Sequence, residues 1–123
     1  FVDNQDKLFR KAQKIRRLLV DHYRALFAEC DCILASAAPT VAPLEDEASD
    51  EALGKEHLVA DNHMQLGNFS GYPSMTLPSG FVDGLPIGVN ITCRPFEEQM
   101  MFDIAKAIEE ETGLADHTVE VKA

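Results

Sequence analysis

The chain has 123 residues, the usual length of one domain, and a compact chain of this length buries roughly 70% of the surface that it exposes when unfolded. A composition of 46% hydrophobic and 26% charged residues, with seven Gly and six Pro, excludes the disordered, collagen-like and coiled-coil classes. The net charge of −10 argues against a free-standing nucleic-acid binder, because an acidic surface repels phosphate.

The sequence predicts neither a membrane span nor a secretory signal. No apolar run approaches the roughly 20 residues that cross a bilayer, and no signal-type hydrophobic segment opens the chain. Three Cys make an odd count without the spacing of a disulfide framework. We therefore expect reduced thiols, a cytoplasmic protein and no contact with a membrane.

The first 24 residues are basic within an otherwise acidic chain. Seven basic and three acidic side chains give this segment a net charge of +4 and leave −14 on the other 99 residues. Basic and apolar positions recur at three- and four-residue steps on separate faces, which predicts an amphipathic helix over about residues 4–27, with Asp3 or Asn4 as N-cap. We favour a solvated basic face near an acidic surface; contact with a tRNA is the alternative. The basic positions are Lys7, Arg10, Lys11, Lys14, Arg17 and Arg24, and the apolar ones are Leu8, Ala12, Ile15, Leu19, Tyr23 and Leu26.

A strand, an irregular loop and an acidic loop are predicted after this helix. Residues 30–35 form a short apolar run that is typical of a buried strand in an α/β sheet. Two prolines in residues 36–43 remove backbone donors and favour extended backbone, so we expect an ordered but irregular loop. Residues 44–56 carry six acidic side chains and one Lys, and we expect an exposed acidic loop there.

Two further helices are predicted. Residues 59–69 show a weak helical pattern that Gly71 and Pro73 end. Residues 96–112 show a stronger one, with acidic side chains in the first turn and Gly113 as the stop signal. The buried stripe of this second helix is expected to be Met101, Ile104, Ala105 and Ile108.

A β-hairpin is predicted between these two helices. Residues 74–80 and 87–93 are strand-like, and Asp83-Gly84 between them favours a tight turn. We therefore expect two antiparallel strands joined by residues 81–86. In the second strand, Ile87, Val89, Ile91 and Cys93 share one face, and Gly88, Asn90 and Thr92 share the other.

A search for catalytic motifs finds none. The sequence lacks a G-x-S-x-G elbow, an S-x-x-K pair, a Gly-rich phosphate loop and an H-E-x-x-H zinc motif. Ser74 and Ser79 lie near predicted strand ends, where a nucleophile could sit, but hydrogen-bonding or solvent-facing roles are commoner for such serines. The common signatures of self-contained hydrolases and nucleotide-binding proteins are therefore absent, which does not by itself exclude chemistry.

A metal site is not predicted either. Cys30 and Cys32 form a C-x-C pair without a second cysteine pair, and we expect core thiols rather than zinc ligands. His57, Asp61 and His63 could be ligands, but they straddle a loop and a helix without a third fixed partner. We expect these two histidines at the surface or behind a site.

Four motifs, in order and at consistent spacing, cover nearly the whole chain. They are K-A-Q-K-I-R-R-L at residues 11–18, D-C-I-L-A-S-A-A-P-T at 31–40, D-x(6)-N-x-x-G-x-P at 61–73 and G-L-P-I-G at 84–88. Together they resemble the C-terminal part of the amidase signature family, and within it the glutamine-hydrolysing subunits of tRNA-dependent amidotransferases. The resemblance implies an α/β fold that is part of a mixed-sheet α/β/α architecture: long N-terminal helix, buried strand, short helix, β-hairpin and C-terminal helix.

The resemblance also implies what this chain contributes. The family's catalytic Lys, its serine next to a cis peptide bond and its nucleophilic Ser all lie upstream of the matching region. We therefore expect residues 1–123 to be a single partial domain, the C-terminal part of an amidase domain, from a fragment or truncated product that opens at Phe1 and is inactive alone. In the family the acidic residue that matches Asp61 faces the substrate pocket, and in the amidotransferases it binds the α-ammonium of glutamine. A carboxylate suits that role through a charge-assisted hydrogen bond; Asp61 as a plain N-cap is the alternative.

The expected partners follow from the same resemblance. They are the B- and C-type subunits of an amidotransferase and, through them, a tRNA, with glutamine as the small-molecule substrate. No cofactor is expected in this chain, and ATP and Mg²⁺ are expected on the partner subunit. Taken alone, the chain should expose a strand edge and apolar surface, and should therefore self-associate.

Two departures from the family pattern motivate other hypotheses. Met64 stands where many members have Thr, and Tyr72 stands in the usual Gly-Leu-Pro position of Leu. These changes suggest, as an alternative, a general amidase that acts on small amides. A third hypothesis, of another class, is a non-catalytic interaction module that docks through its basic helix.

Overall fold

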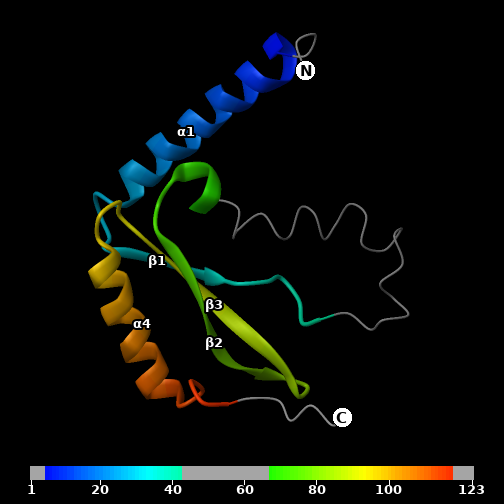
Figure 1. The fold of residues 1–123 in the computed structure, drawn as a ribbon, viewed down its shortest axis with the longest axis vertical. Coiled ribbons are helices and arrows are strands. Elements are labelled where there is room, and N and C mark those ends of the chain that lie inside the picture. Colours follow the sequence, from blue (N-terminus) through cyan, green and yellow to red (C-terminus); the bar gives the residue numbers. More distant parts are fainter. Residues whose placement is uncertain (1–4, 43–66, 118–123) are drawn as a thin grey trace.

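The structure, a computed structural model, describes residues 5–42 and 67–117 (Figure 1). Asp3, Asn4, the predicted acidic loop at 44–56 and most of the predicted short helix lie outside these residues. The elements in chain order are the π-helical turn η2 (Gln5–Phe9), helix α1 (Arg10–Leu26), strands β1 (Cys32–Ser36), β2 (Ser74–Val82) and β3 (Leu85–Cys93), and helix α4 (Glu98–Thr112). Within the described residues, no helix is long and apolar enough to cross a membrane.

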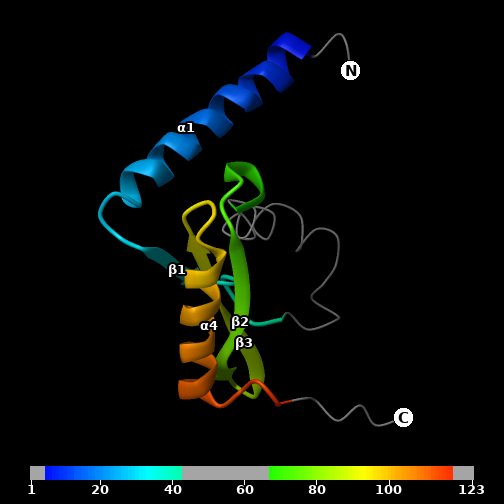
Figure 2. The same ribbon diagram turned by 60° about the vertical axis from the view of Figure 1, so that its left-hand side comes forward.

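The N-terminal helix forms as its periodicity predicts. η2 continues directly into α1, which ends at Leu26, one residue before the predicted end. No residue of α1 is buried, and the helix projects away from the sheet in both views (Figures 1 and 2). Its basic side chains are exposed, as the amphipathic pattern indicated.

The three strands form an antiparallel sheet in the order β1-β3-β2, so β3 lies in the centre. The predicted hairpin is confirmed, but its connection is shorter than the expected residues 81–86, because only Asp83 and Gly84 lie between the strands. Both have positive φ angles, 52° and 80°. A turn of this hand matches the twist of the strands and lets pairing continue up to the turn.

Strand β1 is less buried than predicted. It lies at an edge of the sheet and pairs only with β3 among the described strands, and its residues are half-buried or exposed. Helix α4 packs on β2 and β3 instead and covers one face of the sheet (Figure 2). An apolar run predicts burial but does not say which position in a sheet a strand takes.

The core lies between α4 and the sheet. Ile91 and Cys93 of β3 are 0% exposed, and Leu77 of β2 is also buried. From α4, Met101 and Ala105 are buried, while Ile104 and Ile108 are partly buried against them, which confirms the predicted stripe. Gly113 ends α4 in a left-handed conformation with φ of 64°, as predicted.

Much apolar surface stays exposed, as the sequence predicted. Large hydrophobic side chains are exposed on several elements, among them Leu8 on η2, Leu34 on β1 and Phe96 before α4, which is 96% exposed. Within the described sheet, β1 and β2 each leave one side unpaired. Self-association through this surface stays a prediction.

One side chain, Arg94, connects the ends of three elements. Its guanidinium donates to the Phe27 carbonyl just after α1 (3.1 Å), to the Asp31 carboxylate just before β1 (2.8 Å) and to the Glu97 carboxylate just before α4 (2.8 Å). These carboxylates raise the pKa of Arg94 further, the hydrogen bond to Glu97 most strongly. Arg94 thus ties the end of α1 and the start of β1 to the start of α4.

Three aromatic rings provide the apolar part of the same junction. Tyr23 and Phe27 at the end of α1 stack with Tyr72, with ring centroids 5.3–6.1 Å apart. Burial raises the pKa of the Tyr23 hydroxyl. Arg16 also donates to the carbonyl of Phe69, so α1 is held against the helical residues 67–70 that precede β2.

We predict that Arg94→Lys lowers the midpoint of thermal unfolding, because a single ammonium group cannot reach three acceptors in the fork geometry of a guanidinium. Arg17→Lys is the matched control, since its guanidinium pairs with Asp21 on the same helix (3.2 Å) and ties no second element to it. Circular dichroism melts of both variants measure the difference. Equal midpoints for the two variants would contradict the role assigned to Arg94.

Candidate functional site

The structure describes only the second half of the motif that contains Asp61. Asp61 itself, with His57, His63 and Met64, lies outside the described residues. Residues 67–70 are helical, and Gly71 follows with φ of 76°. The predicted end of the short helix at Gly71 is therefore confirmed.

The chain leaves this helix through a tight, hydrogen-bonded turn. The Gly71 N–H donates to the Gly67 carbonyl at 2.9 Å. The Ser70 hydroxyl donates to the same carbonyl at 3.3 Å and accepts the N–H of Tyr72 at 3.2 Å. A Cβ on Gly67 would lie 2.9 Å from the Cβ of Ser74, so this close approach requires glycine. These hydrogen bonds and this close approach fix the direction in which the chain enters β2.

A buried polar cluster lies where β2 begins. Asn90, 6% exposed, donates to the Met75 carbonyl (3.2 Å) and to the Thr76 hydroxyl (3.0 Å). Its own carbonyl accepts the hydroxyls of Ser74 (3.0 Å) and Thr92 (3.3 Å). Such a fully bonded network is stable away from water, whereas a partly bonded one is costly.

The cluster assigns a role to one of the two candidate serines. Ser74 donates to an amide oxygen, which cannot take a proton as a general base, so its contacts favour positioning over nucleophilic attack. Ser79 is half-buried in β2. Asn90 was not predicted as a site residue, although a polar residue within a β-branched strand is a signal of such a cluster.

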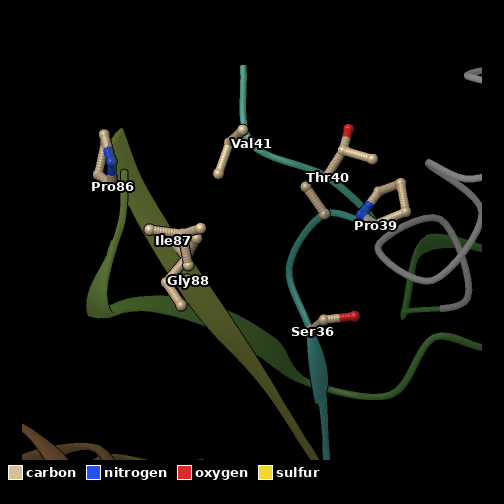
Figure 3. Close-up of a pocket in the computed structure, with 9 residues that line it drawn as sticks. Ser36, Pro39, Thr40, Val41, Pro86, Ile87 and Gly88 are labelled. Atoms are coloured by element: carbon tan, nitrogen blue, oxygen red, sulfur yellow. The ribbon is translucent and has the colours of Figure 1, made fainter. Parts of the chain in front are cut away.

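Two of the family motifs meet at a pocket of about 390 Å³ (Figure 3). One wall comes from the A-P-T loop after β1 and the other from the G-L-P-I-G segment of β3. They are joined by the Ala37 N–H, which donates to the Gly88 carbonyl at 2.9 Å. A Cβ on Gly88 would lie 3.1 Å from the Ala37 Cβ, so this glycine allows the close approach. The lining residues are Ser36, Ala38, Pro39, Thr40, Val41, Val82, Pro86, Ile87 and Gly88.

The lining of this pocket carries no group for proton transfer or nucleophilic attack. None of its nine lining residues has a titratable side chain, and only the hydroxyls of Ser36 and Thr40 offer polar side-chain contacts. Such a surface can bind and orient a neutral group but cannot supply an acid, a base or an activated nucleophile.

A second pocket, of about 430 Å³, lies at the junction of α1 and α4. Arg24, Phe27, Tyr72, Arg94 and Glu97 contribute to it. Its charged groups are already paired, Arg94 with Glu97 and Arg24 with Asp21. Tyr72 is buried at the junction and stacks on Phe27, so its ring contributes to packing there.

The three cysteines are free thiols in different surroundings. Cys30 and Cys32 are half-buried, and Cys93 is buried in the core. Burial raises the pKa of the Cys93 thiol, with smaller contributions from Cys32, Glu97 and Asp31 that Arg94 partly opposes. Among the residues that the structure describes, no three His, Cys, Asp or Glu side chains gather as a metal site would need.

We predict that Asn90→Ala lowers the free energy of unfolding by about 1–3 kcal/mol, because it leaves the buried Thr92 hydroxyl, the half-buried Ser74 hydroxyl and the Met75 carbonyl without their partner. Ser36→Ala, at the exposed end of β1, is the control and should change it by less than about 0.5 kcal/mol. Urea denaturation measures both values. A loss for Asn90→Ala no larger than that of the control would show that the network does not stabilise the fold.

Comparison with known proteins places these motifs in one family. The family model described as amidase matches residues 2–102. The A subunit of the glutamyl-tRNA(Gln) amidotransferase of Fusobacterium nucleatum subsp. nucleatum is 37% identical over 108 residues, which make up 88% of this chain and 22% of that protein. The chain thus spans about a fifth of the length of the curated relatives it matches.

Solved structures agree with the sequence comparison. The A subunit of the glutamyl-tRNA(Gln) amidotransferase of Thermotoga maritima has a TM-score of 0.86 at 29% identity, covering 99% of this chain and 27% of that one. A bacterial aryl acylamidase of the amidase signature enzymes has a TM-score of 0.66 at 27% identity, covering 80% of this chain and 21% of that one. The α/β fold expected from the motifs is therefore confirmed. With a family model matched over most of its length and relatives that share its motifs in order, the chain belongs to the amidase signature family.

Proposed function

We propose that residues 1–123 form the C-terminal part of the amidase domain in a glutamine-hydrolysing A subunit of a tRNA-dependent amidotransferase. The observation that carries this proposal is the likeness to the A subunit from Thermotoga maritima over 99% of the chain, with a TM-score of 0.86. The aryl acylamidase matches less of the chain, 80%, with a TM-score of 0.66. The difference favours the amidotransferase over a general amidase.

In this proposal the chain shapes the substrate site rather than carrying out the chemistry. The A-P-T loop and the G-L-P-I-G segment form a wall without titratable groups. Asp61 binds the α-ammonium of glutamine through a charge-assisted hydrogen bond, which separates an amino acid from a bare amide. The nucleophilic Ser, its partner Ser and the Lys belong to the upstream part of the domain. Alone, the 123-residue chain should show no amidase turnover.

The reaction proposed for the whole protein is the hydrolysis of glutamine through an acyl-enzyme. The ammonia then serves to convert Glu-tRNA(Gln) to Gln-tRNA(Gln) on a partner subunit of the B type, with a C-type subunit completing the complex. ATP and Mg²⁺ would bind that partner, where Glu-tRNA is activated, and not this chain. This assignment places the protein in the cytoplasm, with the translation machinery.

A small-amide substrate is less well supported than the sequence alone suggested. One of the two reasons for this hypothesis was Tyr72, and in the structure this ring is buried against Phe27 and Tyr23. The other reason, Met64, lies outside the described residues. Tyr72 therefore gives no reason to change the substrate.

An interaction role for the basic helix has one observation in its favour. α1 has no buried residue, and both its basic and apolar faces are exposed, including Ile15 and Leu18. A surface of this kind suits a protein partner with an acidic rim. This role is compatible with membership of a multi-subunit enzyme and does not replace it.

We predict that Asp61→Ala, made in the full-length protein in complex with its partners, lowers kcat/KM for glutamine roughly 30-fold or more. This corresponds to the loss of about 2 kcal/mol when one member of a charge pair is removed. Asp61→Asn should be nearly as damaging if the charge matters, and better tolerated if Asp61 is only an N-cap, since Asn caps helices as well as Asp does.

The matched control is Asp103→Asn, because this carboxylate is exposed on α4 and accepts a hydrogen bond from its helix neighbour Gln99 (3.0 Å). Steady-state glutaminase assays at several glutamine concentrations give kcat and KM for each variant. An unchanged kcat/KM for Asp61→Ala would remove Asp61 from the substrate site.

A further inference from the structure

Two of the three cysteines lie opposite each other on neighbouring strands. The register of β1 and β3 pairs Cys32 with Cys93. Directly opposite residues point to the same face of a sheet, and Cys32 packs against the core cluster that contains Cys93. The two thiols therefore share one side of the sheet.

The hydrogen-bond pattern shows which kind of pair this is. Bonded and non-bonded pairs alternate along an antiparallel ladder. Ala37 and Gly88 form a bonded pair through the 2.9 Å bond described above. The Cys32/Cys93 pair lies an odd number of residue pairs further along the same ladder, so it is of the other kind. Consistently, the Cys93 N–H points away from β1 and donates to the Pro73 carbonyl at 3.1 Å. Cys32 and Cys93 are therefore a non-hydrogen-bonded pair.

Non-hydrogen-bonded pairs bring side chains closest together. Their Cα atoms lie about 4.5 Å apart, within the range of roughly 4.4–6.8 Å that disulfides span. The third cysteine has a different position: Cys30 lies before β1, and its thiol donates to the Leu26 carbonyl at 3.3 Å. Of these two cysteines, it is Cys32 that faces Cys93 across the ladder.

We propose that Cys32 and Cys93 form a reversible cross-strand disulfide when the protein meets a hydroperoxide. The more exposed thiolate, Cys32, attacks the peroxide; an S–O bond forms, the O–O bond breaks, and water or an alcohol leaves. The Cys93 thiolate then attacks the sulfenic sulfur, the S–O bond breaks, and water leaves. The two thiols lose two electrons and two protons, the peroxide takes up both, and a thiol reductant reverses the reaction.

The surroundings make Cys32, and not the buried Cys93, the thiol that meets the peroxide. The Cys93 thiol is buried and its pKa is raised, so little thiolate is present to attack. The pair therefore stays reduced until Cys32 is oxidised. Once formed, the bond would join the edge strand β1 covalently to the central strand β3, next to the ion pair of Asp31 and Arg94.

The test treats the 123-residue chain with hydrogen peroxide, then alkylates the remaining thiols and measures the intact mass under non-reducing conditions. We expect one alkylated thiol instead of three and, before alkylation, a mass lower by two hydrogen atoms. Peptide mapping should link the peptides of Cys32 and Cys93, and dithiothreitol should restore all three thiols. The oxidised chain should also melt at a higher temperature than the reduced chain.

Three variants separate this pair from other thiol chemistry. Cys30→Ser should keep the bond, and Cys93→Ser should abolish it. In Cys32→Ser combined with Ile33→Cys, the chain keeps three thiols, but one moves to the other face of β1, and the bond should be lost. A link through Cys30, links only between chains, no link at all, or equal bonding in the Ile33→Cys variant would each overturn the proposal.

Discussion

The placement of helix α1 against the rest of the described fold depends on one guanidinium group. Helix α1 has no buried residue, so it cannot hold its place through a hydrophobic core of its own. Arg94 holds its end by bonding the Phe27 carbonyl, while the same group bonds the carboxylates that precede β1 and α4. Because these bonds are made by one rigid, planar group, they fix the directions of the three elements together. The stacked ring of Tyr72 fills the space beside it.

Close backbone approach organises the candidate site in the same way. Gly88 lets the A-P-T loop bond directly to β3, and Gly67 lets the short helix pack on the start of β2. Two of the family's motifs thus lie against each other and line one pocket. The lining of this pocket can shape a binding site and limit which groups fit into it. Proton transfer and nucleophilic attack need groups that the lining does not contain.

Local patterns in the sequence predicted the local structure well. The helical periods predicted α1 and α4, and Asp83-Gly84 predicted the hairpin, because each of these signals is read over a few residues. The edge position of β1, the bonds of Arg94 and the Asn90 network were not predicted, since they join residues far apart in sequence. Motif order identified the family, but the role of Asp61 rests on the resemblance alone.

The central place of β3 also sets an order of assembly. β2, β3 and α4 are contiguous in the chain, so their contacts close short loops and cost little entropy. β1 pairs with β3 only after the chain between them, which is longer than the hairpin, has closed into a loop. Such non-local pairing is slow. Contact order therefore favours early formation of the hairpin and the C-terminal helix, and later pairing of β1.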